Sequence, residues 1–166
     1  MSTVASALVL ALSIGLLTVR RIDTAAGICA GQGICAAIAM GATGSIAAPI
    51  ALVLNGVAAP LASWRFLDRR KTMHMSLWRW LAATALMIAA LAGLGGLGDG
   101  VALGSSVVLL GLLMSGCGVP ALGLLSAQNG LVLVAGSLPD VPLLPALAVA
   151  VPLVPAMLLA EAWLRR

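Results

Sequence analysis

Four amide side chains lie in the middle of long apolar stretches of this sequence. They are Gln32, Asn55, Gln128 and Asn129. An amide donates and accepts hydrogen bonds but does not exchange a proton at neutral pH. We therefore expect these side chains to bond to neighbouring helices, at about 0.6–2 kcal/mol for each bond, or to form part of a water-bearing polar track. Both roles require the amides to face protein and not lipid.

Ionisable and nucleophilic residues avoid the same positions. No Asp, Glu, Lys, Arg or His falls in the middle of an apolar stretch, so a proton path through this chain alone is not predicted. Cys29, Cys35 and Cys117 have no CxxC spacing and no histidine nearby, which is typical of packing thiols. His74 lies in a basic loop, and the glycine-rich string at 93–98 follows no strand and predicts a loop. We expect no catalytic residue, no metal site and no bound cofactor.

The composition indicates which elements position these amides. Hydrophobic residues make up 62% of the chain and charged residues 8%, against roughly half and a quarter in a soluble domain. A helix crosses the hydrocarbon layer with about 20 apolar residues, and the chain has several runs near that length. We predict an all-α integral membrane protein with seven transmembrane helices, at residues 4–19, 25–43, 46–64, 77–97, 101–117, 119–138 and 141–163.

The division between the fifth and sixth predicted helices depends on helix-breaking residues. Residues 101–138 are almost uninterrupted in their apolar character. One helix of that length would extend about 57 Å, nearly twice the hydrocarbon thickness. Gly116 and Pro120 lie within it, and proline cannot continue a helix while glycine tolerates a turn. Two helices joined by a tight turn are therefore predicted.

The distribution of charge predicts the orientation. Lys and Arg accumulate on the cytoplasmic side of membrane proteins, and all nine in this chain fall there if the amino terminus is outside and the carboxyl terminus is cytoplasmic. Asp99 and Asp140 then lie outside. Because the cations cluster at the ends of apolar runs, the net charge of +4 is expected to face the lipid bilayer and no nucleic acid. The clusters include the topology anchors Arg20, Arg21, Arg69, Arg70, Arg165 and Arg166.

Two smaller patterns agree with helices in a membrane. Gly27 and Gly31 are four residues apart on one predicted helix, a spacing that allows a neighbouring helix to approach closely. Tryptophan favours the headgroup level of a bilayer. The four tryptophans fall near predicted cytoplasmic helix ends, at Trp64, Trp78, Trp80 and Trp163.

An internal repeat is indicated when the chain is shifted against itself by 96 residues. The shift overlays Gln32 on Gln128, the only two glutamines in the chain, and Pro49 on Pro145. Both repeats begin outside, so they are predicted to be parallel. The predicted units are a first three-helix repeat at 1–70, a spacer helix at 71–100 and a second three-helix repeat at 101–166.

Three stretches of the chain resemble a known family. Residues 124–135 (LLSAQNGLVLVA) are similar to the segment of the hydrogenase-4 component E family in which a glutamate precedes Asn-Gly and an apolar run. That family is itself similar to the small K subunit of complex I and to the C subunit of multi-subunit cation/proton antiporters. Residues 20–33 resemble the basic turn and Gly-Leu-Glu helix of the K subunit, and 52–70 resemble its last helix. The resemblance covers nearly the whole chain.

The resemblance implies a multi-pass subunit of the bacterial inner membrane, packed beside an antiporter-like subunit of a group 4 hydrogenase-like or complex I-like assembly. In the family, the positions of Gln32 and Gln128 usually carry glutamate, and Asn55 falls where glutamate or lysine is expected. A neutral amide at each position leaves no group to exchange protons. We therefore expect a non-catalytic subunit. A stand-alone small transporter or channel, and an assembly factor for a membrane complex, remain open as alternatives.

Overall fold

The computed structural model describes residues 2–44, 48–66, 76–116 and 120–138, which form helices and no strand. The prediction of an all-helical fold is confirmed over these residues. The helices are α1 (Ser2–Thr18), α2 (Ile22–Gly41), α3 (Ala48–Ala51), the π-helix η1 (Leu52–Ala58), α4 (Ala59–Phe66), α5 (Leu77–Leu94), the 3-10 turn η2 (Gly95–Leu97), α6 (Asp99–Ser115) and α7 (Pro120–Ser137).

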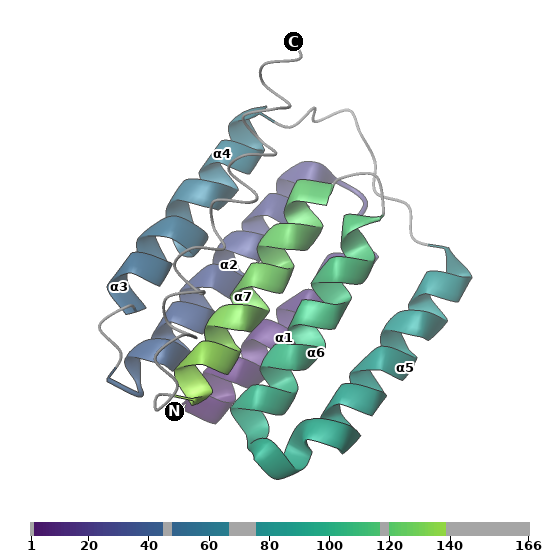
Figure 1. Ribbon diagram of the computed structural model, residues 1–166. Coiled ribbons are helices and arrows are strands. Elements are labelled where there is room, and N and C mark those ends of the chain that lie inside the picture. The colour runs from purple at the N-terminus through teal and green to yellow at the C-terminus, as the bar shows by residue number, and fades with distance from the viewer. Residues whose placement is uncertain (1, 45–47, 67–75, 117–119, 139–166) are drawn as a thin grey trace.

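Four helices form the centre of the bundle. The α1–α2 hairpin and the α6–α7 hairpin lie against each other, because α2 packs on α7 and α1 packs on α6. A continuous rod made of α3, η1 and α4 covers α2 on one side, and α5 covers α6 on the opposite side (Figure 1). The amino-terminal end of α1 and the α5–α6 turn lie at the same end of the bundle (Figure 1).

The π-helix inside the α3–η1–α4 rod has a local cause in the sequence. Ala59 donates its backbone N–H to the carbonyl of Leu54, five residues earlier, instead of four as in an α-helix. The next residue is Pro60, which has no N–H with which to bond the carbonyl of Gly56. The wider turn accommodates this missing donor. It also sets the direction in which the Asn55 side chain points from the rod.

Glycines let two pairs of helices approach almost to backbone contact. A Cβ on Gly104 of α6 would lie 2.8 Å from the carbonyl oxygen of Gly130 on α7, and one on Gly111 would lie 2.6 Å from that of Gly123. A Cβ on Gly33 of α2 would lie 2.7 Å from the backbone nitrogen of Gly56 in η1. These contacts are too short for any side chain, so α6–α7 and α2–η1 are the tight interfaces.

The expectation that Gly27 and Gly31 create a close helix approach is wrong. A Cβ at Gly27 would meet nothing within 4 Å, and one at Gly31 would meet only the Leu12 side chain at 3.4 Å. Gly33, two residues further along α2, makes the close approach instead. Spacing along one helix does not show which face meets a neighbour, because that depends on how the helix is rotated in the bundle.

Two of the described helical stretches are long and apolar enough to cross a membrane. They are Ile22–Gly41 and Leu77–Leu97, whereas Val4–Thr18 and Asp99–Ser115 are apolar but shorter. The predicted break between the fifth and sixth helices is confirmed, because α6 ends at Ser115 and α7 begins at Pro120. The seventh predicted helix, 141–163, lies outside the described residues, and the count of seven spans stays a prediction.

Large apolar side chains are common on the outside of the bundle. Only 11% of an 18-residue window within Leu77–Leu97 is buried, and Trp78 is 79% exposed. The outer faces of other helices also carry exposed apolar residues, which include Val4, Leu8, Ile38, Val53, Leu61 and Leu112. Exposed large apolar side chains are therefore found on most of the described helices.

Candidate functional site

The four amides that the sequence singles out are all inside the bundle. Gln32 of α2 and both Gln128 and Asn129 of α7 are 0% exposed, and Asn55 of η1 is 1% exposed. The prediction that they face protein is confirmed. The three elements that carry them meet at the centre of the fold, where α2 packs against both α7 and η1. We refer to these four side chains as the amide cluster.

Helix α7 supplies two adjacent amides that bond to two different elements. Gln128 donates a hydrogen bond from Nε2 to Oδ1 of Asn55 in η1. Asn129 donates from Nδ2 to the backbone carbonyl of Cys29 in α2, at 3.3 Å. Consecutive residues on a helix point about 100° apart, so α7 can connect both neighbours from a single turn.

Gln32 extends the cluster to the first helix. Its Nε2 donates to Oγ of Ser13 in α1 at 2.7 Å, and Ser13 in turn donates to the backbone carbonyl of Val9 at 2.9 Å. The two glutamines that the predicted repeat pairs therefore share complete burial and a donating role. Their partners differ, because Gln32 bonds within its own hairpin whereas Gln128 bonds to the rod.

The backbone of α2 holds Asn55 in place. Gly33 lies so close to η1 that a Cβ on it would overlap the Asn55 carbonyl. Gly56, on the other side of this contact, would bring a Cβ within 3.1 Å of the Ile34 side chain. The glycines that flank the amides thus fix the distance between α2 and η1, and with it the reach of Asn55 towards α7.

Several polar atoms of this region have no hydrogen-bond partner among the described residues. They are Oε1 of Gln32, Nδ2 of Asn55, Oε1 of Gln128, Oδ1 of Asn129 and Oγ of Ser126. Each unsatisfied buried polar atom costs about 1–3 kcal/mol. Together, these atoms are a large cost for one small region. Three of these atoms are amide oxygens, so the cluster has spare capacity to accept hydrogen bonds.

The cluster contains no group that can act as an acid or base near neutral pH. Each of the hydrogen bonds described above joins an amide of the cluster to another amide, a serine hydroxyl or a backbone carbonyl. The thiol of Cys29 is buried next to the cluster, and it donates to the carbonyl of Leu122 on α7 at 3.8 Å. The amide cluster can form hydrogen bonds and hold helices in position, but it has no group that can accept and release a proton near neutral pH.

No set of three His, Cys, Asp or Glu residues suited to a metal is found within the described ranges. Cys29 is buried, as predicted, and Cys35 is half-buried. Cys117 and His74 lie outside the described residues. The glycine-rich string at 93–98 forms the end of α5, the η2 turn and Gly98, whose φ of 113° favours glycine.

The predicted topology anchors are described only in part. Arg20 and Arg21, between α1 and α2, are exposed. Arg69, Arg70, Arg165 and Arg166 lie outside the described residues. A further arginine, Arg79 at the start of α5, donates from Nη1 to the carbonyl of Gly116 at the end of α6, at 2.7 Å. A cation at a helix carboxyl end is favourable, so this bond ties α5 to α6.

Sequence reasoning missed the serines of this region. Ser13 is the acceptor for Gln32, and Ser126 lies one turn from Gln128 and Asn129 on α7. Both are fully buried in the middle of apolar runs. A hydroxyl in such a run gives only a weak signal, because serine commonly bonds to its own helix backbone.

Comparison with known proteins finds no match to a protein-family model, to a curated protein or to a solved structure.

Proposed function

We propose that this chain is a non-catalytic membrane-arm subunit of a multi-subunit oxidoreductase that resembles group 4 hydrogenases or complex I. It packs beside an antiporter-like subunit and shapes the lateral proton route without carrying a titrating group of its own. The observation that carries the proposal is the amide cluster, which is buried among four helical elements and made of neutral groups alone.

The distribution of polarity supports a place in the bilayer. Among the described residues, the buried polar side chains are all amides or serines and are surrounded by an apolar core, while leucine, isoleucine and valine side chains also cover much of the outside. In water this arrangement would expose apolar surface and bury polar groups, and both are unfavourable. In lipid it is the expected one, because apolar tails cover the outside and polar side chains join the helices.

The chemistry of the cluster supports a role that does not involve proton exchange. An amide holds the same charge throughout the physiological pH range. Its oxygen can accept a bond from water, and three such oxygens are unpartnered in the described residues. The cluster therefore orders a polar region inside the subunit, while the groups that gain and lose protons belong to the neighbouring subunit.

The orientation that accompanies this proposal places the amino terminus outside and the carboxyl terminus in the cytoplasm of a bacterial inner membrane. The amino-terminal end of α1 and the turn between α5 and α6 are then both on the outer side. This agrees with their position at the same end of the bundle (Figure 1). Arg20, Arg21 and Arg79 are on the inner side.

Affinity purification of the full chain in a mild detergent, followed by mass spectrometry of the co-purifying proteins, tests the proposal. Chains that resemble hydrogenase or quinone-oxidoreductase subunits, in fixed stoichiometry, are expected. Two results would count against it. Ion flux from the purified chain alone in liposomes would indicate a transporter or channel, and transient association with assemblies that lack it when complete would indicate an assembly factor.

Leucine substitutions in the purified complex test the role of the cluster. Gln32→Leu, Gln128→Leu and Asn55→Leu remove polar atoms but keep the approximate volume of the side chains. A complex that assembles is expected to retain most of its proton pumping. Severe loss of pumping in a complex that still assembles would contradict the scaffold role and would place the proton route through this subunit.

A further inference from the structure

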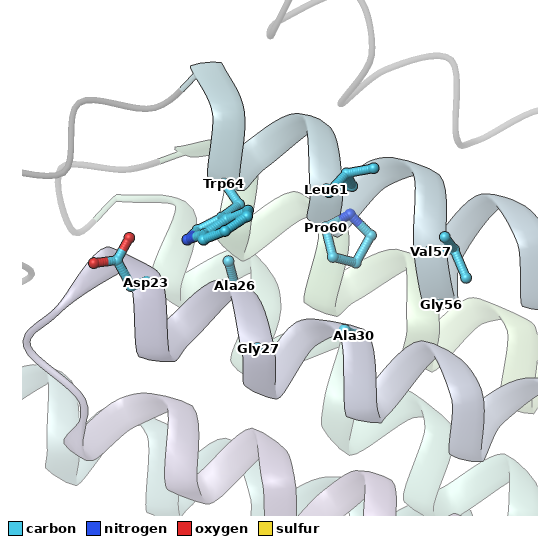
Figure 2. Close-up of a pocket in the computed structure, with 9 residues that line it drawn as sticks. All are labelled: Asp23, Ala26, Gly27, Ala30, Gly56, Val57, Pro60, Leu61 and Trp64. Carbon is cyan, nitrogen blue, oxygen red and sulfur yellow. The ribbon is translucent and has the colours of Figure 1, made fainter.

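A groove opens on the outer face of the bundle, between α2 and the rod. Its volume is about 280 Å³. Small side chains of α2 form its floor, at Ala26, Gly27 and Ala30, and larger apolar side chains of the rod form its wall, at Val57, Leu61 and Trp64 (Figure 2). The groove lies along the same seam between α2 and the rod as the tight contact of Gly33 with Gly56, and Gly56 is one of its lining residues.

The floor of the groove is open at Gly27, whereas Ala26 beside it is packed in the core. A Cβ built on Gly27 would meet nothing within 4 Å. From Asp23 to Ala30 the groove follows α2 for two turns, which is about 10 Å along the helix axis. A slot of this length and volume, lined almost wholly by carbon, matches the upper part of one acyl chain.

One end of the groove carries charge. The carboxylate of Asp23 lines the groove, and Figure 2 shows the indole nitrogen of Trp64 directed towards it. The guanidinium of Arg21 lies 4.0 Å from the same carboxylate, and its side chain is 81% exposed, outside the groove. Arg20, the preceding residue in the chain, is also exposed. An anion therefore lines the groove and one cation, Arg21, lies beside it outside the groove.

We infer that this groove binds a phospholipid with a primary-amine headgroup. The ammonium lies against Asp23, the phosphate lies towards Arg21, and one acyl chain follows the floor over Gly27 and Ala30. The pattern of charge decides the headgroup, because a purely anionic lipid would place its charge against the carboxylate that lines the groove. The inference rests on the membrane location of the proposed function.

Lipid retention by the purified full chain tests the inference. The protein is reconstituted with equal amounts of phosphatidylethanolamine, phosphatidylcholine and phosphatidylglycerol, extracted in mild detergent, and the retained lipids are quantified by mass spectrometry. Phosphatidylethanolamine should be retained about fivefold over phosphatidylcholine, as expected for one net hydrogen bond, because the two headgroups carry the same charge. A quaternary ammonium has no N–H, so phosphatidylcholine isolates the contribution of hydrogen bonding to Asp23.

Two variants and a matched control separate headgroup recognition from acyl binding. Asp23→Asn should abolish the preference for phosphatidylethanolamine while retaining some lipid. Gly27→Leu places a side chain in the open floor and should reduce retention of all three lipids. Gly15→Leu is the control, because Gly15 on α1 also has nothing within 4 Å of a Cβ and does not line the groove.

The outcomes distinguish this inference from the proposed function. Equal retention of the three lipids by the unaltered protein, preferential retention of phosphatidylglycerol, or unchanged retention by Gly27→Leu would overturn the lipid site alone. Recovery of the native chain in the soluble fraction after cell lysis, with no membrane-bound pool, would overturn both. Co-purification of oxidoreductase subunits does not depend on the headgroup preference and tests only the function.

Discussion

Gln128 of α7 donates a hydrogen bond to Asn55 of η1, 73 residues earlier in the chain, and both elements pack against α2. Both side chains are almost completely buried. The bond joins the second hairpin to the rod that covers the first, so it connects parts of the chain that no local contact would bring together. The strength of this bond can be measured.

The first prediction concerns the pair itself. Gln128→Leu should destabilise the protein by about 1–2 kcal/mol, because it leaves Asn55 with a buried and unbonded amide. Asn55→Leu should have a similar effect for the same reason. The double variant should lose less than the sum of the two, because neither partner is then left unsatisfied. Unfolding of the protein in detergent micelles by increasing denaturant measures all three free energies. Strict additivity of the two single effects would show that the bond contributes nothing.

The second prediction concerns the contact between α2 and η1. Gly33→Ala should destabilise the fold by about 1–3 kcal/mol, because its Cβ would overlap the backbone of η1. Gly15→Ala is the matched control, since its Cβ would meet open space and alanine is a better helix former than glycine by about 1 kcal/mol. Thermal unfolding of the two variants side by side gives the comparison. A stability for Gly33→Ala equal to or above that of Gly15→Ala would contradict the tight interface.

The third prediction concerns the π-helix. Pro60→Ala restores an N–H that can bond the Gly56 carbonyl, so the rod can return to α-helical geometry. When the wide π turn is replaced by an α turn, Asn55 moves around the helix axis by about one residue step, or about 100°, relative to α4. The free energy of coupling between Asn55 and Gln128, measured by the same double-variant cycle, should then fall to near zero. Coupling of undiminished size in the Pro60→Ala background would show that proline does not set the rotation.

The fourth prediction concerns orientation in the membrane. Arg20→Cys and Asp99→Cys, each in a chain whose native cysteines are replaced by alanine, place single thiols at two exposed positions at opposite ends of the bundle. A membrane-impermeant maleimide added to spheroplasts should label position 99 at once and position 20 only after the membrane is permeabilised. The positive-inside arrangement requires this result. The reverse pattern would invert the predicted topology.

The helices and the interior location of the amides could be predicted from the sequence, because both follow local or compositional rules. A run of apolar residues forms a helix wherever it is sheltered, and Pro120 cannot lie in the middle of one, so the break before α7 was predictable. An amide among apolar residues is too costly to leave facing lipid, so the burial of Gln32, Asn55, Gln128 and Asn129 was predictable too.

The partners of those amides were decided only by the tertiary structure. The sequence pairs Gln32 with Gln128 through a repeat, but the fold joins Gln128 to Asn55 and Gln32 to Ser13. It also places Gly33, and not Gly27, at the close helix contact, and this leaves Gly27 as the floor of a groove. Each of these outcomes depends on the rotation of a helix about its own axis. Packing against distant helices sets that rotation, and the order of residues along a single helix does not specify it.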